Sequence, residues 1–267
     1  MSGWTLRLRN PPPLRVDLRG ITPAALTGAD PTQLKVPHGN ATLALGELFD
    51  ITPRAGDDML VFEGDCSRLD RIGWQMDGGS IVVEGTVGHY AGALMRSGRL
   101  HVRGSVGELA ACEMAGGELT IDGDAGDFAA ATLPGSMDGM RGGTLIVRGN
   151  VGARCGDRMR RGSVVVFGNA GDFLASRLVA GTIALAGRCG AHAGYGMRRG
   201  SLVFTERASP PAHTFVESID DAAIAWQLLA RDLARHGGAF ADLPSRRIRR
   251  WRGDLAAQGK GEWIACT

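Results

Sequence analysis

Apolar positions in the middle of the chain recur with a spacing of 19 residues. An apolar residue, usually methionine, marks each repeat, and a single step of 26 residues interrupts the series. The marker residues are Met76, Met95, Met114, Met140, Met159, Leu178 and Met197. Five and seven positions after each marker the residue is apolar, as at Ile81 and Val83, with mixed residues beside them. This alternation predicts one short strand with one buried face in every repeat.

Glycines occupy three further fixed positions, which lie three, nine and twelve residues after each marker. Gly79, Gly85 and Gly88 fill them in the first repeat. Glycine suits corners that need a positive φ or a close backbone approach, and repeats of this length leave no room for a long helix. Because a single coil cannot bury its own apolar face, the coils must stack. The repeat therefore predicts an all-β fold, a right-handed parallel β-helix whose coils pair with the coils above and below.

The period divides the chain into three parts. Residues 59–205 hold the β-helix repeats. Residues 1–58 do not fit the period and are expected to form an N-terminal cap, in which Thr5–Arg9 alternates like an edge strand. Residues 206–267 are expected to form a C-terminal helix and tail that pack on the solenoid, because Ile219–Leu233 has the spacing of an amphipathic helix of roughly five turns.

Two segments break the period and are candidates for contact with another protein. The repeat that starts at Met114 is seven residues too long, and an insertion in a repeat array forms a loop on one face. Met137 and Asp138 are the candidates in this loop, although a neutral surface loop is equally compatible with the pattern. The candidates in the C-terminal tail are Arg252, Asp254, Lys260 and Glu262.

No catalytic or metal-binding set stands out in the sequence. The six histidines and five cysteines are scattered, and no CxxC, G-x-S-x-G or HExxH motif occurs. Asp122, Asp124 and Asp127 cluster near one corner, which gives one enzymatic alternative, a calcium-dependent β-helix enzyme acting on polysaccharides. Solvated corner carboxylates are the simpler interpretation, because the next repeat lacks them. We therefore predict no catalytic, cofactor-binding or metal-binding residues on this chain.

Charge and cysteine content indicate the kind of partner and the compartment. The net charge of +2 provides no strong field for nucleic acid or an acidic membrane. No apolar stretch approaches the length of a membrane span, and the N-terminus lacks a signal-peptide pattern. Single, scattered cysteines are typical of a reducing cytosol. We expect a cytoplasmic protein that binds neither nucleic acid nor membrane.

The repeat M-x-x-G-x-[LIV]-x-[VIL]-x-G-x-x-G, with the ending Arg252–Leu255 and Gly259–Glu262, resembles the C subunit of formylmethanofuran dehydrogenase. Leu6–Leu8 followed by prolines, and Gly46–Phe49, are similar to the start of that family, so the resemblance covers essentially the whole chain. The glycine repeat alone also resembles the C-terminal β-helix domain of the glutamate synthase large subunit, which is an alternative. The tail and the lack of an amidotransferase or flavin domain favour the C subunit.

The resemblance implies a hetero-oligomeric enzyme complex in which this chain is a structural arm that binds no cofactor itself. In methylotrophic bacteria such a formyltransferase/hydrolase complex moves a formyl group from tetrahydromethanopterin to a methanofuran analogue and releases formate. The partners implied are an amidohydrolase-like hydrolase that holds the metal, a formyltransferase and a B-type subunit. In methanogens the related complex is a tungsten or molybdenum dehydrogenase that loads CO2 on methanofuran. The Ala- and Arg-rich composition favours the bacterial complex.

Overall fold

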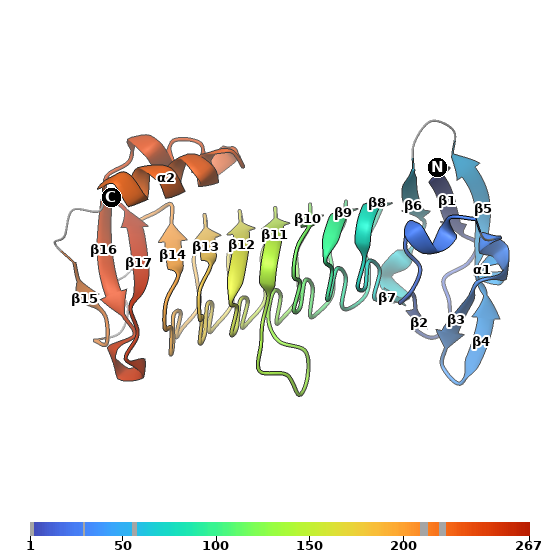
Figure 1. Ribbon diagram of the computed structural model, residues 1–267, viewed down its shortest axis with the longest axis horizontal. Coiled ribbons are helices and arrows are strands. Elements are labelled where there is room, and N and C mark those ends of the chain that lie inside the picture. Colours follow the sequence, from blue (N-terminus) through green and yellow to red (C-terminus); the bar gives the residue numbers. More distant parts are fainter. Residues whose placement is uncertain (1–2, 29, 55–57, 209–212, 219–222) are drawn as a thin grey trace.

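The computed structural model describes residues 3–28, 30–54, 58–208, 213–218 and 223–267. The described residues form one sheet of 13 strands, a second sheet of four strands and a few helices. The molecule is elongated, with the N-terminal elements at one end and the C-terminal elements at the other (Figure 1). The fold is therefore mostly β, as the repeat predicts.

The repeat strands lie side by side along the length of the molecule (Figure 1) and pair in parallel with their sequence neighbours. They are β8 (Asp77–Val83), β9 (Ser97–Val102), β10 (Glu118–Ile121), β11 (Arg141–Val147), β12 (Arg161–Val166), β13 (Thr182–Leu185) and β14 (Ser201–Phe204). Equivalent positions face each other, so that Leu100 is opposite both Ile81 and Leu119. A second row of parallel bridges joins Val87, Val106, Ala125, Val151, Ala170 and Cys189. The parallel pairing predicted from the period is confirmed.

The marker residues form the core of the stack. All seven, from Met76 to Met197, have no exposed surface, and the apolar strand positions Leu119 and Ile121 are equally buried. A second inward row, predicted fifteen residues after each marker, is also buried at Ala110 and Cys155. Each fully buried large side chain contributes about 1.5–3 kcal/mol to folding. The methionines are thereby explained as packing residues, and the flexible thioether fits small differences between coils.

The three glycine positions serve two different purposes. The first needs a positive φ, which is +83° at Gly117 and at Gly143. The second and third lie against the backbone of the preceding coil: a Cβ at Gly104 would meet the carbonyl carbon of Gly85 at 2.5 Å. Other left-handed residues were not predicted, because they are not glycines. They are Tyr90, Leu109, Phe128, Arg154 and Phe173, with φ between 59° and 65°.

At the N-terminal end, β1 (Gly3–Leu8) pairs in parallel with β6 (Met59–Glu63) and antiparallel with β5 (Phe49–Arg54). The prediction that Thr5–Arg9 forms an edge strand was wrong, because the chain returns and adds β5 outside β1. The remaining cap elements are β2 (Val16–Asp17), β3 (Lys35–His38), β4 (Ala41–Ala44), β7 (Leu69–Asp70), α1 (Leu45–Leu48), and the 3-10 helices η1 (Ala24–Leu26), η2 (Pro31–Gln33) and η3 (Cys66–Arg68).

At the C-terminal end, β17 (Gly261–Cys266) pairs in parallel with β14. β16 (Ile248–Gly253) follows antiparallel beside β17, and β15 (Val216–Glu217) pairs antiparallel with β16. The short 3-10 helices here are η4 (Gly238–Phe240), η5 (Leu243–Ser245) and η6 (Leu255–Ala257). The tail thus extends the sheet instead of hanging free.

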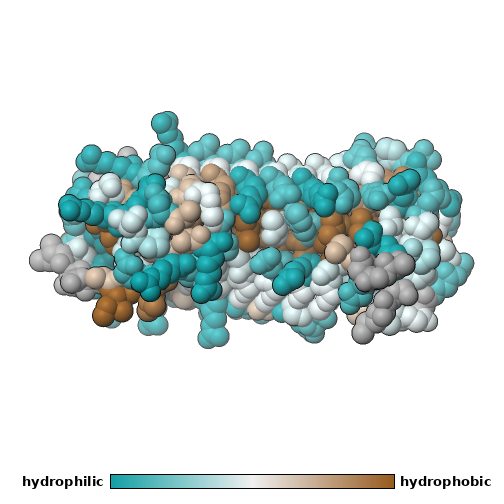
Figure 2. Space-filling model, turned by 90° about the horizontal axis from the view of Figure 1, so that it is seen from above, coloured by the Kyte–Doolittle hydropathy of each residue, from teal (hydrophilic) through white to brown (hydrophobic). Residues whose placement is uncertain are grey.

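Helix α2 (Ala223–Ala234) lies across the C-terminal coils (Figure 1). Its buried residues Trp226, Ala230 and Leu233 belong to an apolar cluster with repeat residues that include Val165 and Val203. The helix was predicted to begin at Ile219, which lies outside the described residues. Figure 2 shows apolar side chains gathered at this end of the molecule. Among the described residues, no helix has the length and apolar character needed to cross a membrane.

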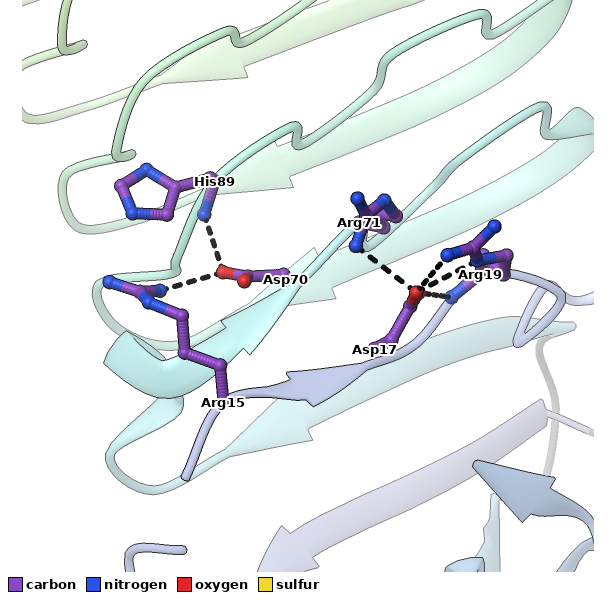
Figure 3. A network of polar contacts seen from close by, with 6 residues as sticks. All are labelled: Arg15, Asp17, Arg19, Asp70, Arg71 and His89. Carbon is purple, nitrogen blue, oxygen red and sulfur yellow. Dashed lines mark hydrogen bonds and ion pairs between the residues drawn. The ribbon is translucent and has the colours of Figure 1, made fainter. Parts of the chain in front are cut away.

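Two carboxylates tie the N-terminal cap to the first coils (Figure 3). Asp70 Oδ1 accepts hydrogen bonds from Arg15 Nη1 at 2.7 Å and from the backbone N–H of His89 at 2.8 Å. Asp17 Oδ2 accepts from Arg71 Nη1 at 3.1 Å and from the Arg19 side chain. The cap and the coil each contribute a carboxylate and a guanidinium, so both contacts hold the cap in place.

Asp17→Asn is expected to lower the free energy of unfolding by about 1–2 kcal/mol at neutral pH. Burial opposes ionisation of Asp17, but hydrogen bonds from Arg19 and the charge of Arg71 outweigh burial and lower its pKa below the ordinary 3.8. The carboxylate therefore stabilises the fold above the ordinary value, and this contribution disappears as the pH falls through the lower, folded-state pKa. Denaturant unfolding at several pH values measures it.

Asp50→Asn is the matched control, because Asp50 forms an exposed ion pair with Arg9. Such exposed pairs contribute about 0–1 kcal/mol. An equal loss of stability for Asp17→Asn and Asp50→Asn at neutral pH would contradict the role given to Asp17, and so would a loss that persists at strongly acidic pH.

Candidate partner-binding surface

The long coil insertion, residues 131–139, projects from the stack between β10 and β11 (Figure 1). Met137 is 66% exposed at its tip, and its Sδ lies 3.0 Å from Arg158 Nη1. Asp138 Oδ1 accepts a hydrogen bond from Arg160 Nε at 2.6 Å. Both contacts run to the next coil, so the loop is held against the stack while it presents Met137 to the outside.

Arginines next to this loop occur at repeated positions beside the marker residues. Arg141 follows Met140 directly, Arg160–Arg161 follow Met159, and Arg198–Arg199 follow Met197. Val179 and Ala180 hold the same two positions in the intervening coil. Since these two side chains are shorter than arginine, a hollow of about 560 Å³ lies between the rows, lined by five arginines and no carboxylate: Arg141, Arg160, Arg161, Val179, Ala180, Arg198 and Arg199.

A second hollow of about 440 Å³ shares Arg160, Val179 and Arg198 with the first. It extends from Met137 in the insertion to Asp254 in the tail. The two hollows form one surface, named here the arginine groove. Its arginines are Arg141, Arg158, Arg160, Arg161, Arg177, Arg198 and Arg199.

Among the predicted tail residues, Asp254 has a structural task. It is 6% exposed, and its two oxygens accept backbone hydrogen bonds from Gly196 and Ala256, both at 3.0 Å. The first of these bonds fixes the tail to the last repeat, so Asp254 borders the groove while holding the tail in position. Glu262 accepts a hydrogen bond from Arg250 at 3.2 Å within the β16–β17 hairpin.

The predicted contact residues fall into two groups. Met137 and Asp254 lie along the same hollow, and Asp138 orients Arg160, which lines both hollows. Arg252 and Lys260 are exposed on the C-terminal hairpin and are absent from the lining of the arginine groove. The insertion and the tail, separated by more than a hundred residues in sequence, are thus brought to one groove.

The three clustered aspartates have partners within the stack. Asp124 Oδ1 accepts from the backbone N–H of Asn150 at 2.6 Å, and Asp127 Oδ1 accepts from that of Ala153 at 2.7 Å. Asp122 pairs with His101 at 2.8 Å. Other side chains bond the backbone of the following coil in the same way, as Asp172 does with Ala191. The aspartates therefore belong to a hydrogen-bond ladder between coils, which removes the support for a polysaccharide-acting site.

The described residues contain no group of three or more His, Cys, Asp or Glu side chains that could hold a metal ion. All five cysteines are free, and burial raises the pKa of Cys66 and Cys155 to about 12 and that of Cys112 further. Because the thiolate is the nucleophile, these thiols are poorly suited to covalent catalysis near neutral pH.

A thiol reagent at pH 8 is expected to leave Cys66, Cys112 and Cys155 unmodified in the folded protein and to modify them once guanidinium unfolds it. Burial both blocks access to these sulfurs and keeps them protonated. Mass spectrometry of digested, labelled protein identifies the modified positions. Rapid labelling of Cys112 in the folded state would contradict the packing described for the coils.

The arginine groove was missed by the sequence analysis, although a signal was present. The two positions after each marker hold Arg160–Arg161 and Arg198–Arg199 in coils that are two repeats apart, and stacking brings such residues to one face. What the sequence did not provide is the course of the tail, which brings Asp254 beside them.

No family model matches the sequence. The C subunit of the formyltransferase/hydrolase complex Fhc of Methylorubrum extorquens is 48% identical over 87 residues, which are 32% of each chain. The C subunit of the tungsten-containing formylmethanofuran dehydrogenase 2 of Methanothermobacter wolfeii is 31% identical over 100 residues, 35% of this chain and 37% of that one. These alignments span about a third of the length of the curated relatives.

The structural comparison covers almost the whole chain. One chain in the crystal structure of the formyltransferase/hydrolase complex (FhcABCD) from Methylorubrum extorquens, solved with methylofuran, matches with a TM-score of 0.92. The sequences are 44% identical over this match, which covers 98% of the present chain and 99% of the other. Because the aligned relative from the same organism is the C subunit, the chain belongs to the family of C subunits of the formyltransferase/hydrolase complex.

Proposed function

We propose that this chain is a non-catalytic structural subunit of a formyltransferase/hydrolase complex. The complex would transfer a formyl group from tetrahydromethanopterin to a methanofuran analogue and release formate. The observation that carries the proposal is the match over 98% of the chain, at 44% identity, to a chain of the FhcABCD complex. The chain would act as an elongated arm on which catalytic subunits are held.

The chemistry of the described residues supports a structural role. The clustered aspartates bond neighbouring coils, and the buried thiols of Cys66, Cys112 and Cys155 have raised pKa values. In this proposal the hydrolase-like partner holds the metal, and the partners rather than this chain bind the methanofuran-type and tetrahydromethanopterin carriers. The partners are an amidohydrolase-like hydrolase, a formyltransferase and a B-type subunit. The free cysteines fit a cytoplasmic location.

The alternative is the C subunit of a tungsten or molybdenum formylmethanofuran dehydrogenase. Those relatives are 31% identical over 100 residues and 39% identical over 80 residues. The formyltransferase/hydrolase relative is 48% identical over a stretch of similar length. The higher identity favours the formyltransferase/hydrolase complex, and neither alternative gives this chain a catalytic role.

The finer description of the fold is part of the proposal. We infer a right-handed parallel β-helix over residues 59–205, an N-terminal cap over residues 1–58 and a helix with a tail over residues 206–267. Parallel pairing of β8 to β14 and the second row of parallel bridges support coils stacked in one direction. Parallel strands joined by a crossover are right-handed in the great majority of folds.

The proposed contacts with partner subunits are the insertion and the C-terminal hairpin. Met137 is exposed and Asp138 positions Arg160, while Arg252 and Lys260 are exposed on the hairpin. Asp254 and Glu262 are assigned a positioning role, because their carboxylates bond within the chain. The elongated stack would then present several separate contact areas along its length.

Purification of the tagged chain from its native host tests the proposal. We expect hydrolase-like and formyltransferase subunits to co-purify in fixed ratio, and to be reduced when Met137 and Asp138 are replaced by alanine. Arg99→Ala serves as the control, because Arg99 is exposed on β9 away from the insertion. Recovery of an unaccompanied chain that itself catalyses formyl transfer or formate release would overturn the proposal.

A further inference from the structure

The arginine groove carries more positive charge than the surrounding carboxylates compensate. Glu113 lies 3.5 Å from Arg141, and Asp138 pairs with Arg160. Asp157 lies 3.7 Å from Arg158 and 3.3 Å from Arg177. These three carboxylates face four of the seven arginines. The described part of the chain offers no ion pair or side-chain hydrogen bond to the remaining arginines, Arg161, Arg198 and Arg199.

Asp157 shows that part of the groove is built and not accidental. Its side chain is only 6% exposed, and it lies between Arg158 and Arg177. Burying a carboxylate is costly unless cations compensate it. The carboxylate in turn restrains two guanidiniums at the base of the groove, which leaves their outer nitrogen atoms directed by a fixed partner. The base of the groove is therefore better ordered than a set of independent surface arginines.

The spacing of the arginine rows fits an extended chain. Adjacent coils are about 4.8 Å apart, so Arg160–Arg161 and Arg198–Arg199 lie on coils separated by roughly 10 Å. Val179 and Ala180 form the apolar floor between the rows. In an extended peptide, side chains on one face recur about every 6.6–6.8 Å. Two or three acidic side chains could therefore reach both rows while the peptide backbone lies over the floor.

We propose that the arginine groove binds an extended acidic peptide segment of a partner subunit, an inference that rests on the proposed function. The guanidinium group presents a planar fork of donors that matches a carboxylate in two-point hydrogen bonding. Binding would neutralise like charges on neighbouring coils. The groove runs between Met137 and Asp254, so the bound segment would connect the insertion and the tail, the two proposed contact areas.

The features of the groove favour a peptide over a nucleic acid. Tyr195 is the only aromatic residue among those that line it, which gives no series of stacking platforms for bases. The chain as a whole carries a net charge of only +2. The apolar floor and the exposed Met137 at one end suit the mixed chemistry of a protein segment.

Binding of a fluorescent acidic octapeptide of alternating Asp and Glu to the full chain tests the inference. We expect salt-sensitive binding that falls about tenfold or more when Arg198 and Arg199 are both replaced by alanine. The double replacement of Arg96 and Arg99 is the matched control, since Arg96 has the repeat position of Arg198 on a distant coil. Equal unfolding midpoints for the variants will show that the fold is intact.

The purified complex provides the second arm. We expect the complex to bind the octapeptide far more weakly than the separate chain, because a partner segment already fills the groove. The inference is overturned if the complex and the separate chain bind it equally, if the Arg198 and Arg199 replacements change nothing, or if a short RNA binds as tightly as the peptide. Failure of the wild-type chain to form a complex at all would instead refute the proposed function.

Discussion

Gly104→Ala is expected to lower the free energy of unfolding by about 2–3 kcal/mol. A Cβ at this position would lie 2.5 Å from the carbonyl carbon of Gly85 and 2.5 Å from the nitrogen of Thr86. Both atoms are backbone of the preceding coil, so no side-chain rotation relieves the overlap. The coils must move apart, which weakens the hydrogen bond from Gly104 N to Gly85 O, now 3.2 Å long.

Gly85→Ala is the matched control, because Gly85 has the same repeat position one coil earlier. Its added Cβ would meet only the carbonyl oxygen of Gly64, at an ordinary contact distance of 3.4 Å. We expect a change within about 0.5 kcal/mol for this variant. Urea unfolding followed by circular dichroism and tryptophan fluorescence compares the two. Equal stabilities for the two variants would show that close approach between coils does not explain this glycine position.

Trp263→Ala is expected to lower the free energy of unfolding by about 3–5 kcal/mol and to expose the last coil. Trp263 in β17 is 3% exposed, and its ring lies 4.4 Å from that of Phe204 in β14 and 6.0 Å from that of Phe215. These three rings cover the core at the C-terminal end of the stack. Because an uncovered solenoid end offers apolar surface and open strand edges, the variant should also aggregate more readily.

Trp263→Phe separates aromatic packing from the rest of the side chain. The buried Nε1 of Trp263 has no hydrogen-bond acceptor, so its loss removes an unsatisfied donor. We expect this variant to lose less than about 1.5 kcal/mol, since a phenyl ring can still pack on Phe204. Unfolding midpoints and light scattering on heating measure both effects. A stability loss for Trp263→Phe as large as that for Trp263→Ala would contradict the packing role of the ring.

The repeated part of the fold could be predicted because its contacts follow from a local pattern. Met114 and Leu119 are buried for the same reason as their equivalents one coil away, and the register follows from the step of 19 residues. The positive φ of Gly117 was also within reach of the sequence. That of Phe128 was not, since a phenylalanine gives no sign of a left-handed conformation, and stacking imposes it.

The ends of the molecule were harder to predict, because their contacts join segments far apart in sequence. β1 reads as an edge strand on its own, but β5 returns after an excursion and pairs outside it. The basic stretch at Ile248–Gly253 was expected to be an interface strand or a tail, and it pairs on both sides within the sheet. Alternating patterns give the strand but not its neighbours.

The candidate surface was predicted in part. The insertion was found because it breaks the period, and Met137 is exposed as an outer contact residue must be. Asp254 was selected from a motif, yet its carboxylate bonds Gly196 and Ala256 and so mainly shapes the tail. The arginine groove depends on three coils and the tail together, and no single repeat contains it.

The central claim, that this chain organises the complex and performs no chemistry itself, is tested most directly by measuring formate release. The substrate is a formylated methanofuran analogue. The assay compares the purified chain, the partner subunits prepared without it, and the two mixed together. The account predicts no release by the chain alone and a gain on mixing that accompanies assembly into one complex. Release by the chain alone, at a rate near that of the mixture, would contradict it.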